Sequence, residues 1–182
     1  MIFPEKEILL KDGRTALLRS PAPEDAEALL DYLRAVSGET DFLLRAPEEA
    51  ETDPEKERAW VRGRLGSPDA LVISSFLGGR VVGNCEIAFS PRKKTAHRAT
   101  LAIALRREVW GLGLGSAMFS ELIAAGEARA GVSVLELSCV EGNVRALALY
   151  EKFGFRTVCR RPNAFRLSDG RVCGELFLQR EL

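Results

Sequence analysis

The chain has few of the residues that build metal sites and disulfide frameworks. It contains one histidine and four cysteines among 182 residues. Cys85, Cys139, Cys159 and Cys173 are widely spaced, without a C-x-x-C pair or a histidine cluster beside them, which argues against a zinc site. All four lie in apolar, strand-like runs, so we expect small buried hydrophobic side chains rather than ligands or disulfide partners.

An excess of charge of one sign and long apolar runs are also lacking. The 26 basic and 26 acidic side chains cancel, which argues against nucleic acid or a membrane surface as the main partner. No stretch approaches the run of about 18 apolar residues that indicates a membrane span, and the chain does not start like a signal peptide. We therefore expect a cytoplasmic protein with no membrane and no nucleic-acid partner.

The composition is that of an ordinary globular protein, with 46% hydrophobic and 29% charged residues, and its length predicts a single domain over residues 1–182. Apolar residues alternate in some segments and recur at helical spacing in others, which predicts a mixed α/β fold. Expected strands cover residues 8–10, 15–18, 70–77, 80–89, 97–105, 134–140, 156–161 and 171–179. Expected helices cover residues 26–38, 54–66, 117–130 and 144–153, and Asp53 can cap the second of them.

Two connections between these elements matter for the topology and the site. The crossover through the third helix makes the strands at 97–105 and 134–140 parallel if both lie in one otherwise antiparallel sheet. The connection at 39–52 has no steady period, and we expect that it can line a pocket.

A glycine-rich turn joins the fifth strand to the third helix, with the sequence Trp110-Gly111-Leu112-Gly113-Leu114-Gly115-Ser116. Glycine allows tight turns and close approach of a ligand to the backbone. The helix start offers N–H groups without partners at the positive end of a dipole, so the turn is a candidate phosphate site. A plain strand-to-helix turn with glycines for packing is the alternative.

A second motif lies in the fourth helix. Asn143 can cap this helix, Tyr150 falls on its apolar face, and Gly154 provides a left-handed stop. On periodicity alone, a tyrosine at this position is more often a core residue than a functional one.

Together these features resemble the GNAT superfamily of acyl-CoA-dependent N-acetyltransferases. The turn is similar to the family signature Gln/Arg-x-x-Gly-x-Gly/Ala except at its first position, and residues 143–155 are similar to Asn-x-x-Ala-x-x-Leu-Tyr-x-x-x-Gly-Phe. The resemblance implies a central, mostly antiparallel, splayed sheet with helices on both faces. It also implies an enzyme that transfers an acetyl group from acetyl-CoA to a primary amine by direct attack in a ternary complex, without a metal. The amine, of a small molecule or a protein, stays open, and the family tends to form homodimers.

The resemblance also assigns residues to the cofactor. Backbone groups of Ile103 and Leu105, left unpaired where the two middle strands splay, would bind the pantetheine arm and the acetyl carbonyl. The amides from Gly111 to Gly115 and the helix start at Ser116 would hold the pyrophosphate. Trp110 and Leu112 depart from the family, which usually has Gln or Arg at the first position and often Lys at the second. Balancing charge is then expected from Arg106, Arg107 or another basic side chain.

Tyr150 matches the general acid of the family and Asn143 the start of its motif, and the resemblance assigns both to the cofactor site. A tyrosine with a pKa of about 10 keeps its proton at neutral pH and can protonate a leaving thiolate, since thiols have a pKa of about 8.5. The position at which many relatives carry a Glu as general base is occupied by Thr100. Glu86 on the preceding strand is the candidate, acting directly or through water. Glu136 and His97 are weaker alternatives.

Two other functions remain open at this stage. A strand, glycines, a helix and a later Glu136 imitate the dinucleotide-binding pattern of an oxidoreductase. The glycine spacing and the antiparallel strands before it fit that pattern poorly. A domain of the same family that binds acyl-CoA without catalysis, as a sensor or interaction module, is the other alternative, because the usual strand Glu is missing.

Overall fold

Eight strands and four α-helices follow one another in the predicted order, in a computed structural model that describes residues 1–182. The strands are β1 (Lys6–Leu9), β2 (Thr15–Arg19), β3 (Ala70–Leu77), β4 (Arg80–Phe89), β5 (Arg98–Leu105), β6 (Val134–Val140), β7 (Arg156–Arg166) and β8 (Val172–Glu181). The helices are α1 (Ala26–Glu39), α2 (Pro54–Gly66), α3 (Leu114–Ala128) and α4 (Val144–Lys152).

All strands form one sheet in the order β1-β2-β3-β4-β5-β6-β8-β7. Every neighbouring pair is antiparallel except β5 and β6, which are parallel because α3 carries the chain back across the sheet between them. The predicted parallel pair and the predicted mixed fold class are both confirmed.

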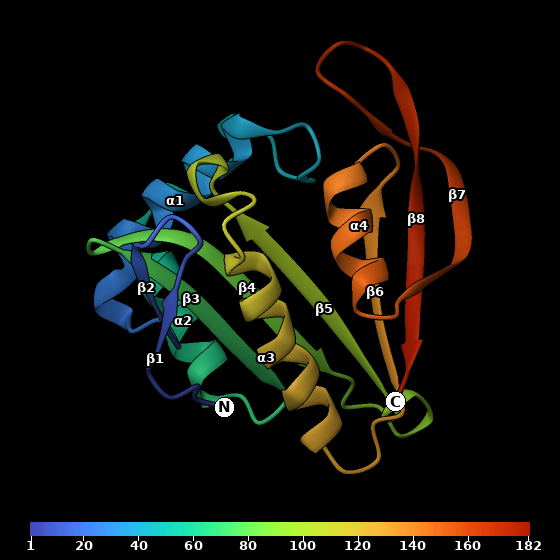
Figure 1. Cartoon of the computed structure of the whole chain (residues 1–182), viewed down its shortest axis with the longest axis horizontal. Helices are drawn as coiled ribbons and strands as arrows, with labels where there is room; N and C mark the ends of the chain where they lie inside the picture. Colours follow the sequence, from blue (N-terminus) through green and yellow to red (C-terminus); the bar gives the residue numbers. More distant parts are fainter.

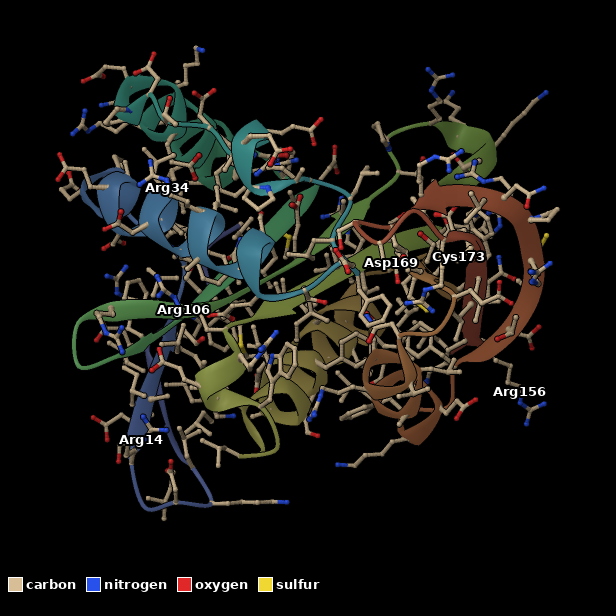
Figure 2. The ribbon with its side chains drawn as sticks, turned by 90° about the horizontal axis from the view of Figure 1, so that it is seen from above. Arg14, Arg34, Arg106, Arg156, Asp169 and Cys173 are labelled. Carbon is tan, nitrogen blue, oxygen red and sulfur yellow. The ribbon has the colours of Figure 1, made fainter.

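Helices cover both faces of this sheet. Figure 2 shows α1 and α2 on one side of the strands and α3 and α4 on the other. The larger core lies under α3 and α4, where Met118, Leu122 and Phe155 pack against the strands. The smaller core lies under α1 and α2 and includes Leu29 and Val61. The apolar stripes of the helices explain this arrangement, since each must face the sheet to be removed from water.

The two middle strands separate toward their carboxyl ends. The register of β5 with β6 covers only the pairs from Arg98↔Val134 to Thr100↔Glu136, and beyond these pairs the strands diverge (Figure 1). The splay that the family resemblance implied is therefore present. The β7–β8 hairpin extends past the open end, and the Ser168 hydroxyl there donates to the Asp41 carboxylate at 2.9 Å (Figure 1).

Local capping signals are confirmed at the helix ends. The Asp53 carboxylate accepts the N–H of Glu55 at 2.9 Å at the start of α2, and the Asn143 side chain accepts the N–H of Ala146 at 3.2 Å at the start of α4. Gly154 ends α4 with a φ of +83°. These ends were predictable because each cap depends on residues within a few positions of it.

Three details differ from expectation. Helix α3 begins at Leu114 rather than at residue 117. Its first turn therefore includes Gly115, although glycine has a low helix propensity. Strand β7 continues to Arg166 through Pro162, which an edge strand tolerates. The prediction that all four cysteines are buried is wrong: only Cys85 is buried, and Cys159 is exposed on that edge strand.

None of the helices is both long and apolar enough to cross a bilayer.

Candidate active site

The glycine turn directs backbone N–H groups out of the start of α3. Gly111 and Gly113 have φ angles of +77° and +92°, in the left-handed region that glycine adopts without strain. Gly113 caps the helix, and its carbonyl accepts the first bond within the helix at 3.1 Å. The N–H groups of the next three residues, Leu114, Gly115 and Ser116, therefore have no partner inside α3. Together with the helix dipole, they favour an anion at this position.

Close packing explains two other residues of the turn. A Cβ atom on Gly115 would lie 3.0 Å from a methyl group of Leu105 on β5 and 3.8 Å from one of Leu149 on α4. Glycine thus lets α3 start against both elements. Leu112 packs its side chain on the main core, and its carbonyl accepts the N–H of Lys11 at 3.1 Å. The backbone of Leu112 therefore ties the turn to the β1–β2 hairpin, and its apolar side chain joins the turn to the core.

Trp110 replaces the polar first residue of the family signature with an aromatic platform. Its indole N–H donates to the carbonyl of Leu105 at 2.8 Å. The guanidinium of Arg145, from α4, lies over its ring with Cζ 4.8 Å from the centroid, and that of Arg107 lies at 5.7 Å. The indole therefore holds two cations beside the glycine turn, each by a cation–π contact.

The positive charge around the turn comes mainly from α4, which sequence reasoning missed. The backbone N–H of Arg107 donates to the Glu39 carboxylate, and its guanidinium donates to the main-chain carbonyl of Glu39. Arg145 forms no ion pair, and the Lys152 ammonium donates to the Ser116 hydroxyl at 3.1 Å. Positions 145 and 152 are two turns apart on one helix face, and that spacing was the available signal.

Arg106, named as a charge donor from the sequence, belongs to the sheet instead. Its N–H donates to the Val82 carbonyl of β4 at 2.8 Å, and its Nε is buried without a hydrogen-bond partner. Consecutive residues of a strand direct their backbone N–H and C=O groups to opposite sides. Because the N–H of Arg106 points toward β4, the backbone N–H and C=O groups of Ile103 and Leu105 point toward β6. Pairing with β6 ends before them. Their N–H groups lie at the open gap, where an acyl carbonyl can accept them.

Helix α4 holds Tyr150 in the main core, against which Ile103 and Leu105 also pack. The Tyr150 side chain is 6% exposed and packs against Phe119, with ring centroids 5.4 Å apart, and against Phe155 at 6.5 Å. Its hydroxyl makes no hydrogen bond to the protein. Burial raises the pKa of this phenol, and the nearby Cys139 thiol adds to the shift. Tyr150 therefore keeps its proton and has it free to donate.

Glu86 lies on the face of the sheet that α1 and α2 cover, as does Asn84, whereas Tyr150 lies on the face under α3 and α4. The Glu86 side chain is 19% exposed, and Nη1 of Arg64 lies 3.1 Å from Oε1 in an ion pair that is not aligned as a hydrogen bond. Burial raises the pKa of the Glu86 carboxyl although Arg64 opposes the shift. A carboxylate with a raised pKa is a better proton acceptor than an ordinary one.

The weaker candidates are less suited to base catalysis. Both oxygens of Glu136 are occupied by Arg98, with N···O distances of 2.7 and 2.9 Å. His97 is exposed at the start of β5, whereas the glycine turn follows its end. A strand of eight residues separates these two ends by roughly 26 Å. Three consecutive basic residues, at positions 92–94, precede β5 and lie at the same remote end.

A cavity of about 300 Å³ between α1, α2 and β4 was missed from the sequence. Glu57 lines it although its side chain is only 7% exposed. Glu57 precedes Val61 and Leu65 by four and eight positions on α2, so it shares their buried face, and this was the signal. The connection at 39–52 lines the cavity through Arg45 and Glu51, as expected of it.

No group of three or more His, Cys, Asp or Glu side chains is placed to hold a metal ion.

The sequence model of the acetyltransferase (GNAT) family matches residues 30–155. The acetyltransferase of GNAT family from Streptococcus pneumoniae is 26% identical, with a TM-score of 0.85 over 92% of this chain and 99% of that chain. A ribosomal-protein-alanine N-acetyltransferase from Brucella melitensis is 25% identical, with a TM-score of 0.77 over 91% of this chain and 99% of that chain. At 21% identity, yncA from Salmonella typhimurium, solved with its cofactor acetyl-CoA, shares the fold, with a TM-score of 0.74 over 91% and 92% of the two chains.

Proposed function

The chain belongs to the GNAT acetyltransferase family, whose sequence model covers more than half of it, and on this premise we propose that it transfers an acetyl group from acetyl-CoA to a primary amine. The observation that carries the proposal is the unpaired edge of β5, whose residues Ile103 and Leu105 pack against the same core that contains Tyr150 and its free hydroxyl. In this proposal, residues 1–182 act as one N-acetyltransferase domain.

The glycine turn and α4 fit coenzyme A. The amides of Gly113 to Ser116 would bind the pyrophosphate, with Arg145 and Lys152 supplying positive charge. The positive φ angles of Gly111 and Gly113 favour residues without Cβ atoms where a phosphate must approach the backbone. Acetyl-CoA supplies an acyl group activated as a thioester, and the gap between β5 and β6 offers it an entrance.

In this proposal, different residues around the gap assist different steps of the acetyl transfer. The N–H groups of Ile103 and Leu105 would donate to the carbonyl oxygen as it gains charge. As the amine nitrogen bonds to the carbonyl carbon, the carbon–sulfur bond breaks, and Tyr150 delivers its proton to the sulfur. Asn143 caps α4 and thereby positions this tyrosine.

The attacking amine must lose a proton, because amines with a pKa near 10 are largely protonated at neutral pH. We assign this proton to Glu86, directly or through one water. The face of the sheet with Glu86 is open beside it, since Ala102, its partner on β5, is exposed. With Glu86 available, the missing acid at Thr100 does not by itself argue for an inactive domain.

A thermal-shift experiment combined with thiol release tests the proposal. Acetyl-CoA at a hundredfold excess over its Kd should stabilise the fold by about 2.7 kcal/mol, which corresponds to a rise in Tm of roughly 5–10 °C. NAD, which has a pyrophosphate but no pantetheine arm, is the matched control and should give a smaller shift. An absent shift with acetyl-CoA would refute cofactor binding. A shift without thiol release from a broad amine panel would favour a binding module.

A further inference from the structure

Glu57 is a buried carboxylate without a partner. It lines the cavity between α1, α2 and β4, and it makes no side-chain hydrogen bond and no ion pair within 4.0 Å. Its helix position near the amino end of α2 offsets part of the cost of a buried charge. No protein counter-ion offsets the rest of that cost, because Glu57 has no ion-pair partner within 4.0 Å.

The other acidic side chain of the cavity is already paired. Glu51 pairs with the Lys56 ammonium at 3.5 Å and accepts the N–H groups of Thr52 and Asp53. Arg45 is exposed on the 39–52 connection and makes no ion pair. The pKa of Glu57 is raised by burial, with Arg45 opposing the shift. Glu57 is therefore the one carboxylate of the cavity without an ion-pair partner, and the unpaired guanidinium of Arg45 is the positive group that influences it.

The walls of the cavity suit an alkylammonium group. Trp60 and Tyr32 contribute aromatic rings, and Leu29 and Leu33 contribute aliphatic surface. Aromatic faces attract cations, and aliphatic side chains pack on a methylene chain. Such a lining, with a single free carboxylate, matches an ammonium on a short hydrocarbon chain.

The cavity adjoins the proposed reaction gap through β5. The Tyr32 hydroxyl donates to the Ala104 carbonyl at 2.9 Å, and Asn84 on the floor of the cavity is the register partner of Ala104. Ala104 lies between Ile103 and Leu105, whose N–H groups face the gap. Two strand spacings separate gap and cavity, a distance of roughly 10 Å.

Building on the proposed acetyl transfer, we propose that this cavity binds a second ammonium group of the acceptor through Glu57. The acceptor is then a diamine or polyamine whose two nitrogens are roughly 10 Å apart. One nitrogen reaches the gap and is acetylated, while the other stays in the cavity as the cation that Glu57 lacks. Glu57 acts as a specificity-determining residue and does not take part in the chemistry.

Thiol release with paired amines tests this assignment. Diaminobutane, diaminoheptane and diaminooctane are compared with butylamine, heptylamine and octylamine, which have the same chain lengths but only one nitrogen. The longer diamines should exceed their monoamine counterparts by about tenfold in kcat/KM, as expected for one charge-assisted hydrogen bond, and diaminobutane should gain little. The kcat/KM values of a diamine and of its monoamine are measured with the same protein preparation, so any unfolded fraction of the protein cancels in their ratio.

Three variants identify the source of that preference. Glu57→Gln should reduce the diamine preference to about twofold or less while the monoamine rates persist. Glu48→Gln removes a charge from an exposed residue of the nearby connection and should leave the preference intact. Arg45→Gln separates ligand binding from an internal ion pair: the preference should stay or rise, and its loss would identify Arg45 as the true partner of Glu57.

The outcomes distinguish this inference from the proposed function. Equal rates with monoamines and diamines, or faster acetylation of peptide amino termini than of every diamine, would overturn the diamine site and leave the acetyl transfer intact. No turnover with any amine, despite binding of acetyl-CoA, would overturn the proposed transferase and the acceptor site with it.

Discussion

Replacement of Tyr150 by phenylalanine isolates the group on which the proposed chemistry depends. The ring is 6% exposed and packs between Phe119 and Phe155, and phenylalanine preserves all of this packing. The hydroxyl has no hydrogen-bond partner in the protein. The variant therefore removes a proton donor from the gap without removing a structural contact.

The expected effects on stability and activity have different sizes. Loss of an unpartnered hydroxyl should leave the free energy of unfolding unchanged or raise it by about 1 kcal/mol, a Tm change between zero and roughly +4 °C. Loss of a positioned general acid should lower kcat about 100-fold, equivalent to about 2.7 kcal/mol of barrier. The Kd for acetyl-CoA should change by about twofold at most, because the glycine turn is untouched.

Tyr32, the other of the two tyrosines in the chain, provides the matched control. Its hydroxyl donates to the Ala104 carbonyl at 2.9 Å in a site that is 1% exposed. Tyr32→Phe should therefore cost about 1 kcal/mol and lower Tm by roughly 2–4 °C. Melting curves and thiol-release kinetics measure both variants. An unchanged kcat for Tyr150→Phe, or a Tm loss equal to that of Tyr32→Phe, would refute the role given to Tyr150.

Three further changes test other parts of the site. Glu86→Gln should lower kcat/KM about 100-fold and remove the acid limb of the pH profile, since a base works only above its pKa, which burial raises above 4.5 here; an unaltered profile would exclude Glu86. Glu57→Gln should raise Tm at neutral pH, because a raised pKa in the folded state means that the charged carboxylate destabilises the fold, and glutamine carries no charge. The gain in Tm should vanish as the pH falls below 4.5, where the wild-type carboxyl is neutral too. A gain that persists in acid would contradict this reasoning. Gly113→Ala should cost about 1–2 kcal/mol at a φ of +92° and weaken acetyl-CoA binding, whereas Gly131→Ala, at a φ of +86° with nothing near its Cβ position, should lower Tm alone. Equal Kd values for the two alanine variants would place the cofactor elsewhere.

The sequence by itself determined the features that depend on neighbouring residues. The caps at Asp53 and Asn143, the stop at Gly154 and the glycine turn were all readable, because caps and positive φ angles are local requirements. The order of strands and helices followed from apolar periodicity, and the parallel pair followed from the crossover through α3. The family resemblance then implied the splay between β5 and β6, which the register confirms.

Only the tertiary structure decided which charges meet. It placed Arg145 against Trp110, Arg64 beside Glu86 and Arg98 on Glu136, each from a different element. Pairings of this kind depend on the packing of segments far apart in the chain, and long flexible side chains carry no local signal of their partner.

Burial was the second property that the sequence left undetermined. Glu57 has the sequence appearance of a solvated helix residue, and it is buried because α1 and the 39–52 connection close over α2. Cys159 shows the reverse, since an apolar strand residue is exposed when its strand lies at the sheet edge. Periodicity determines which side of an element a residue occupies, whereas the neighbouring elements determine whether that side reaches water.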